Sequence, residues 1–416
     1  MEHRGTLGIT RGTALYVGAL MGPGVLLIPA LAVEAAGPAS LVAYLALLVL
    51  SAPLAITFAA LGARHPVAGG VTAYVRAGLG DGAASATTLC FLVAIVLGAP
   101  AVALVGGYYV ADLAGGGTPV AVAAGAAMTA AVLVANAFGV RVSATAQLAL
   151  SGVLVAVLAV AIALALPEGE PGAWTPFAPH GWWAVGTAAN LLAWLFIGWE
   201  AMAQWAGEFR DPGRDLPRAV ALAYATIAVL YIGLGVATVA VAPDAGSKVP
   251  LADLLDAGLG GAGRTATVAL ALALTMGTMN VYLAGASRLA SSLASAGELP
   301  GWLAPARRPL LAVGLTSAVV LAALAAGVAG PDDLVRVTSA CFIAVYLLAL
   351  TSAVRILAGL PRAAAVAALA LSTVLAVFSA LYLAVPAAAA AFAVLQARAR
   401  RRRRRARATA PACEAA

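Results

Sequence analysis

Apolar runs of about 20 residues recur from one end of this chain to the other, and each is long enough to cross the roughly 30 Å hydrocarbon layer of a bilayer. Of the 416 residues, 63% are hydrophobic and only 10% are charged. A water-soluble domain carries charge on roughly a quarter of its residues, so this chain cannot cover itself in water. The sequence therefore predicts an all-α integral membrane protein.

About twelve transmembrane helices are expected, one for each apolar run. They lie at residues 12–34, 39–61, 84–112, 119–137, 143–166, 184–206, 218–242, 265–294, 309–328, 333–354, 362–379 and 380–397. The last two runs share about 36 residues without a polar loop, so they form either a tight hairpin or one long tilted helix. We expect residues 1–397 to form a single transmembrane domain.

The basic residues divide unevenly between the two sides that this order of spans defines. One side collects 21 of the 24 lysines and arginines, and eight of these lie in the tail at Arg398, Arg400–Arg405 and Arg407. Cytoplasmic loops carry such an excess, so both termini are predicted to be cytoplasmic and the protein to lie in the cell inner (plasma) membrane. We expect residues 398–416 to be a disordered cytoplasmic tail held at anionic lipid headgroups. An arginine run can also bind nucleic acid, but no nucleic-acid partner is expected.

Two halves of the chain carry matching features about 175–185 residues apart. The first span is interrupted by Gly-Pro-Gly at residues 22–24, and the sixth by Phe-Ile-Gly-Trp at residues 196–199. The first unit of five spans (about 10–166) starts inside and the second (about 184–354) starts outside. The sequence therefore predicts a five-plus-five inverted repeat with broken first and sixth helices, an arrangement in which the paired breaks mark a binding site.

The break in the first span lies near the bilayer midplane. Pro23 lacks an N–H and clashes with the preceding turn, while Gly22 and Gly24 leave helical geometry at little cost. Backbone groups freed at this depth are tolerated only where they line something polar. Carbonyls from Ala19 to Met21 would suit an ammonium group, and amides after Pro23 would suit a carboxylate. We interpret the break as half of a zwitterion site, with a simple proline kink as the alternative.

Two polar side chains in the second half are further candidates. Glu200 is the only acid expected deep in the membrane, where a carboxylate costs several kcal/mol unless it is paired, protonated or hydrated. It is either a proton site or gate, or a purely structural partner of unwound backbone. Asn280 lies in an apolar span between Thr278 and Tyr282, where it either lines a wall of the site or bonds between helices.

Motifs of hydrolytic and nucleotide-driven chemistry are absent from the sequence. We find no Walker loop, no zinc motif and no nucleophile elbow, and the three cysteines and three histidines form no set with ligand-like spacing. The sequence therefore predicts no enzyme, no cofactor and no bound metal.

Longer motifs resemble a known family. Residues 21–30 (MGPGVLLIPA) and 65–75 (HPVAGGVTAYV) resemble the first helix and first cytoplasmic loop of the amino acid–polyamine–organocation superfamily. Residues 196–220 (FIGWEAMAQWAGEFRDPGRDLPRAV) resemble its sixth helix and following loop. The compact length and the segments GVLLIPALA and PVAGGV resemble its bacterial branch that exports methionine and branched-chain amino acids. The resemblance implies the inverted-repeat fold shared with sodium-coupled leucine carriers, and proton-linked exchange or antiport of amino acids.

The resemblance also implies site residues. The backbone site for the carboxylate corresponds to Gly22, Pro23, Gly24 and Val25, and the facing break to Phe196, Gly198 and Trp199. Glu200 takes the place of an acid linked to proton sensing or gating. The family usually has Ser, Thr or Ala where Pro23 stands, so carboxylate recognition here would fall on the Gly24 and Val25 amides. Leu20 and Val25 fit an apolar pocket for the substrate side chain.

The sequence thus predicts a secondary transporter of neutral amino acids of the methionine, leucine, isoleucine and valine type, working by proton-coupled efflux. Uptake or exchange by the same carrier is the alternative, because sequence does not fix direction. A non-transporting membrane scaffold or receptor is a remote alternative. The predicted partners are the amino-acid substrate and the lipid bilayer, and a proton gradient is the predicted driving force.

Overall fold

The fold is described from a computed structural model, for residues 7–64, 70–139, 144–200, 208–241, 247–305 and 307–409. Within these ranges the chain is helical, and its one β-type pairing is an isolated bridge between Leu7 and Phe209. The prediction of an all-α membrane protein is confirmed.

Long helices form the body of the protein. They are α3 (Ser40–Arg64), α5 (Asp81–Leu113), α6 (Thr118–Ala137), α7 (Ala144–Ala165), α10 (Pro212–Val241), α12 (Gly261–Ser295), α13 (Arg307–Ala325), α14 (Pro331–Ile356), α15 (Leu360–Ser379) and α16 (Ala384–Thr409). The shorter α-helices are α1 (Ile9–Leu20), α2 (Ile28–Ala36), α4 (Gly70–Leu79), α8 (Trp183–Leu192) and α11 (Pro250–Leu259). Short 3₁₀ turns include η1 (Pro23–Leu26), η5 (Ala193–Phe196) and η8 (Ala380–Leu383).

Nine helical stretches among the described residues are long and apolar enough to cross a membrane. The predicted number of about twelve differs from nine for visible reasons. The first predicted span is divided into α1, η1 and α2, and the sixth contains only the short apolar stretch Trp183–Phe196 in the described part. The stretch Leu360–Gln396 counts once although it contains both α15 and the first half of α16. The exact number of crossings stays a prediction.

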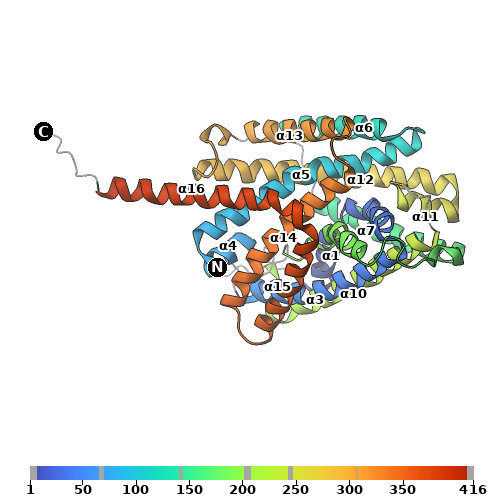
Figure 1. Ribbon diagram of the computed structural model, residues 1–416, viewed down its shortest axis with the longest axis horizontal. Coiled ribbons are helices and arrows are strands. Elements are labelled where there is room, and N and C mark those ends of the chain that lie inside the picture. Colours follow the sequence, from blue (N-terminus) through green and yellow to red (C-terminus); the bar gives the residue numbers. More distant parts are fainter. Residues whose placement is uncertain are drawn as a thin grey trace.

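The last apolar region forms two helices. α15 ends at Ser379, η8 intervenes, and α16 leaves in another direction (Figure 1). α15 packs on α3 and α14, whereas α16 packs on α5. The backbone of α16 is helical to Thr409, so the arginine-rich segment continues the last helix up to that residue, which differs from the expectation of a disordered tail beginning at residue 398.

The two short helices α4 and α11 occupy matching places. α4 follows α3 and packs on α5 and α14, while α11 follows α10 and packs on α12 and α7. Figure 1 shows α4 at one end of the long helices and α11 at the other, with the protruding end of α16 on the side of α4. This matched packing is what the predicted inverted repeat requires, and the repeat remains a prediction.

Candidate functional site

The first predicted break lies between α1 and α2. α1 ends at Leu20, and Gly22 has extended backbone angles (φ −99°, ψ −179°). Helical structure resumes at Pro23 as the 3₁₀ turn η1, and α-helical geometry begins only at Ile28. The Val25 amide donates to the Gly22 carbonyl at 3.4 Å. A proline at the first position of the turn fits its fixed φ and its missing N–H.

The second break lies after α8 and η5. Ile197 is extended (φ −83°, ψ 135°), and Gly198 has φ +134°, a region that favours glycine. A Cβ atom at Gly198 would lie 3.0 Å from the carbonyl oxygen of Ala19, at the end of α1. Both the positive φ and this close approach therefore require glycine at position 198.

The two breaks meet each other. Besides the approach of Gly198 to Ala19, a Cβ atom at Gly24 would lie 3.1 Å from the Leu195 side chain. The buried hydroxyl of Tyr231 on α10 lies 3.0 Å from the Leu20 carbonyl and 2.8 Å from the Leu195 carbonyl, and it donates to both. One tyrosine thus joins the last turns before the two breaks.

A second tyrosine supports the turn that follows the first break. The Tyr109 hydroxyl on α5 donates to the Leu26 carbonyl at 2.8 Å. Both tyrosines are fully buried, and buried tyrosine hydroxyls ordinarily find a partner. Carbonyls at the interrupted turns are therefore hydrogen-bonded by side chains from α5 and α10, as a low-dielectric surrounding favours.

Glu200 is buried beside the second break. Its Oε2 accepts a hydrogen bond from the Gly198 amide at 3.0 Å and another from the Tyr346 hydroxyl of α14. The Tyr346 oxygen in turn accepts from the Gly198 amide at 3.2 Å. The acid is thus held by its own unwound backbone and by a neighbouring helix, an arrangement that serves either protonation state because a hydroxyl can donate or accept.

The predicted aromatic residues lie on two sides of the second break. Phe196 packs edge-to-face on Tyr231, with ring centroids 5.1 Å apart, and borders a small cavity of about 20 Å³ between α3, α14 and α15. Trp199 is fully buried, with its ring 6.0 Å from that of Tyr16 on α1 and 6.2 Å from that of Tyr224 on α10. Neither ring is exposed.

The remaining predicted residues are placed as follows. Leu20, Pro23 and Val25 are buried at the first break, and Gly22 and Gly24 are partly buried there. Asn280 is buried on α12, which packs against η1. The structure thus brings Leu20, Gly24, Gly198 and Glu200 into one region, and the binding role of each residue stays a prediction.

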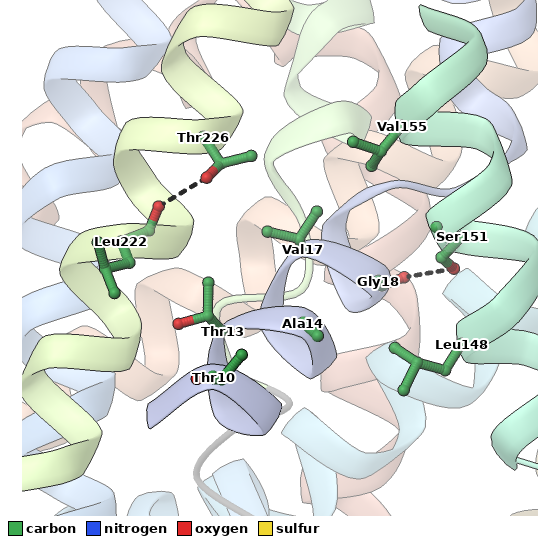
Figure 2. A pocket seen from close by; sticks show the side chains of 11 residues that line it. Thr10, Thr13, Ala14, Val17, Gly18, Leu148, Ser151, Val155, Leu222 and Thr226 are labelled. Carbon is green, nitrogen blue, oxygen red and sulfur yellow. Dashed lines mark hydrogen bonds between the residues drawn. The ribbon is translucent and has the colours of Figure 1, made fainter. Parts of the chain in front are cut away.

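The larger cavity, of about 420 Å³, lies beside α1 rather than at the breaks (Figure 2). Its walls come from α1, α7 and α10, and none of the predicted site residues lines it. Its hydroxyls bond to backbone: Ser151 donates to the Gly18 carbonyl at 3.5 Å and Thr226 to the Leu222 carbonyl at 2.9 Å. The larger space thus flanks the half-helix before the first break, and the smaller cavity borders the second break at Phe196 and Ile197.

Sequence reasoning did not identify Tyr231, Tyr109 or Tyr346. Each lies in an apolar span, where an aromatic residue is more often packing. The available signal was the hydroxyl itself, since a tyrosine deep in a membrane helix needs a hydrogen-bond partner and a broken helix offers carbonyls and amides.

Known proteins share this sequence pattern. The sequence model of the amino acid permease family matches residues 7–409. A Bacillus subtilis protein named as an uncharacterized amino acid permease, YecA, is 33% identical over 357 residues, which cover 83% of this chain and 84% of the relative. The Escherichia coli L-methionine/branched-chain amino acid exporter YjeH is 33% identical over 230 residues, covering 55% of this chain and 54% of the exporter. The Bacillus subtilis branched-chain amino acid permease BcaP is 26% identical over 319 residues, covering 71% and 68%.

Proposed function

Because this chain belongs to the amino acid permease family, we propose that it is a secondary carrier that exports neutral amino acids of the methionine, leucine, isoleucine and valine type, coupled to protons and working by alternating access. The chain is a multi-pass membrane transporter and not an enzyme. The names of two relatives, an L-methionine/branched-chain exporter and a branched-chain permease, support the substrate class.

One observation carries the proposal: two helix breaks lie against each other and share the Tyr231 hydroxyl, with a buried carboxylate beside them. Carbonyls before the first break suit an ammonium group, and the amides after it suit a carboxylate. Leu20, Leu195 and Val25 are buried around the breaks and fit an aliphatic or thioether side chain. A scaffold that transports nothing has no need of paired breaks held in this way.

Both termini are proposed to be cytoplasmic. The arginine-rich end of α16 lies on the side of α4 (Figure 1), and two basic side chains of the predicted cytoplasmic set bond to backbone there. Arg355 Nη1 donates to the Gly78 carbonyl at 3.3 Å, and Arg64 Nη1 to the Ala358 carbonyl at 3.5 Å. The excess of positive charge at this end supports its placement in the cytoplasm. Anionic lipid headgroups are the proposed partners of the arginine-rich segment.

Transport in proteoliposomes tests the substrate and the coupling. Purified protein is reconstituted with radiolabelled methionine, leucine, isoleucine and valine inside, and release is followed with and without an inward proton gradient. The expected result is release that the gradient accelerates. If none of the four amino acids moves under either gradient direction, the substrate proposal is wrong. Release and uptake compared at matched gradients decide between export and the alternative of uptake or exchange.

Glu200→Gln tests the proton site. The amide keeps the shape of the side chain but cannot take up a proton, so transport by the variant should lose its pH dependence. Glu170→Gln, which changes an exposed acid outside the helices, is the matched control and should keep the wild-type profile. A wild-type pH profile for Glu200→Gln would show that the acid is structural.

A further inference from the structure

A charged network joins α11 to the ends of two long helices. The guanidinium of Arg264, at the start of α12, donates two hydrogen bonds to Asp112 at the end of α5. Nε donates to Oδ2 at 2.7 Å and Nη2 donates to Oδ1 at 2.6 Å. Its Nη1 also reaches Asp256 at 3.1 Å, and its Nη2 reaches Asp253 at 3.4 Å, both on α11. Paired N–H···O bonds of this kind are among the strongest that a protein makes.

A second ion pair ties the same region to the site. Lys248, just before α11, donates to Glu34 of α2, the helix that follows the first break. Ser247 donates to Asp253, so this segment is also fastened to α11 itself. α11 is therefore held to α5 and α12 on one side and to α2 on the other, across the end of the molecule that lies opposite α4.

The ion pair at the matching position of the other end is weaker. There, Arg76 of α4 meets Asp81 of α5 through one contact at 3.4 Å, with side chains that are 58% and 67% exposed. The corresponding exposures of Arg264 and Asp112 are 31% and 17%. Among the described residues, the remaining ion pairs all lie at the α11 end. Exposed pairs contribute little because water screens them, whereas half-buried bidentate pairs contribute more.

The two half-helices of the first span also differ in their contacts. A groove of about 420 Å³ flanks α1, which is the half of the broken helix away from α2 and α11 (Figure 2). α1 also packs on α10, and the chain just before it is tied to residues 208–210 by backbone bonds, from the Leu7 amide to the Glu208 carbonyl and from the Arg210 amide to the Leu7 carbonyl. Among the described residues no ion pair involves α1, whereas Glu34 pairs α2 with Lys248.

We propose that Arg264 is the central residue of a latch, formed with Asp112, Asp253, Asp256 and the Lys248–Glu34 pair, that keeps the α11 face of the carrier closed at rest. The inference rests on the proposed transport function for its role in the cycle. Among the residues that the structure describes, the α4 face has no bidentate ion pair of this kind, so the latch sets which face binds substrate more readily. Arg264 is a positioning residue and touches no substrate.

Hydrogen–deuterium exchange of the full-length protein tests the latch without requiring transport. Arg264→Gln should speed amide exchange in α11 and α2 by about tenfold, the change that 1.4 kcal/mol produces, with exchange in α14 unchanged. Arg76→Gln is the matched control and should change exchange in α4 by less than about twofold. Exchange in α11 of Arg264→Gln within twofold of the wild type would overturn the proposal.

A milder substitution distinguishes release of the latch from unfolding of the whole variant. If Arg264→Gln raises exchange throughout the chain, Asp112→Asn replaces it, because the amide keeps the shape and removes one charge. A rise confined to α11 and α2 supports the latch, and a rise throughout the chain in this variant as well overturns it.

The KM for transport, measured separately from each face, distinguishes a latch from a residue that only stabilises the fold. The apparent affinity at a face scales with the fraction of molecules open to it. In membrane vesicles of the two orientations, Arg264→Gln should lower the KM at the α11 face and raise it at the α4 face. Equal changes at both faces contradict the latch. Absence of transport in the wild type as well would refute the proposed function and leave the exchange result as the test of the latch.

Discussion

Tyr231→Phe removes one hydroxyl from the meeting point of the two helix breaks. The hydroxyl lies 2.8 Å from the Leu195 carbonyl and 3.0 Å from the Leu20 carbonyl, and the side chain is fully buried. Phenylalanine keeps the ring, including its edge-to-face contact with Phe196 at 5.1 Å. The substitution therefore tests the two hydrogen bonds and little else.

The loss of stability expected for Tyr231→Phe follows from counting the hydrogen-bond donors at the two carbonyls. A tyrosine hydroxyl has one proton, so the two carbonyls share it. Its loss removes this donor from both, but the Leu20 carbonyl keeps a bond from the Gly22 amide at 3.1 Å, so the cost falls mainly on the Leu195 carbonyl. A buried acceptor left unsatisfied costs about 1–3 kcal/mol. This range corresponds to a change of about 5- to 150-fold in the equilibrium for opening the break.

Tyr44→Phe is the matched control. Tyr44 on α3 is also fully buried, its ring lies against α10 within 3.0 Å of a Cβ built at Gly235, and its hydroxyl has no partner among the described residues. Removing a buried hydroxyl that makes no hydrogen bond should be neutral or stabilising, because its desolvation cost disappears as well. The two substitutions delete the same atom in the same kind of surrounding.

Thermal unfolding in detergent, together with hydrogen–deuterium exchange over residues 15–26 and 190–200, measures the difference. Tyr231→Phe should lower the unfolding midpoint and speed exchange at both breaks, and Tyr44→Phe should do neither. If the two variants behave alike, the shared hydroxyl does not hold the breaks together and the reasoning is refuted.

Three further predictions concern the breaks and α11. Gly198→Ala should destabilise the fold by about 1–3 kcal/mol, because the φ of Gly198 is +134° and the new Cβ would lie 3.0 Å from the Ala19 carbonyl oxygen. Gly285→Ala, where a Cβ meets open space, is the control and should leave the unfolding midpoint unchanged. Pro23→Ser restores an N–H and a hydroxyl at the first break and should lower the KM for substrate several-fold, so an unchanged KM in proteoliposomes contradicts a carboxylate site there. Burial raises the pKa of Asp253, against the opposing effects of Ser247 and Arg264, so the folded chain binds this proton more tightly than the unfolded chain does. The contribution of Asp253 to stability is greatest below the ordinary aspartate pKa of about 3.9 and falls as pH rises through the raised pKa. Asp253→Asn should therefore make the unfolding midpoint depend less on pH across this window. An unaltered pH profile of the midpoint would contradict the raised pKa.

The breaks themselves were predictable from local chemistry. Gly-Pro-Gly at residues 22–24 cannot continue an α-helix, and the position of Gly198 in the sixth span matched it at the expected distance along the chain. The sequence did not indicate that a 3₁₀ turn would separate Pro23 from α2, because that choice depends on the neighbouring Leu195 and Tyr109 contacts. Local propensity locates an interruption, and tertiary contacts decide its geometry.

The partners that hold the site were not predictable from spacing. Tyr231 lies 36 residues from Leu195 and 211 from Leu20, and Tyr346 lies 146 from Glu200. No pattern within one helix links such positions, since they meet only when whole helices pack. The bidentate bond of Arg264 to Asp112, 152 residues away, likewise forms only in the packed structure.

The proposed latch and the direction of transport are separate properties. An inverted repeat offers two equivalent ends, so a preference for one resting state must come from residues that the halves do not share. Arg264 with its three carboxylates, compared with the more exposed pair Arg76–Asp81, is such a difference. A preference of this kind changes the apparent affinity at each face, because only the open fraction binds. It cannot change the direction of net flux, since a shift between two conformations adds no free energy to a cycle that returns to its start. Direction is therefore to be read from the gradients under which substrate accumulates, and the latch from the ratio of the two affinities. A variant that alters the ratio while leaving the accumulated level unchanged would show both properties at once.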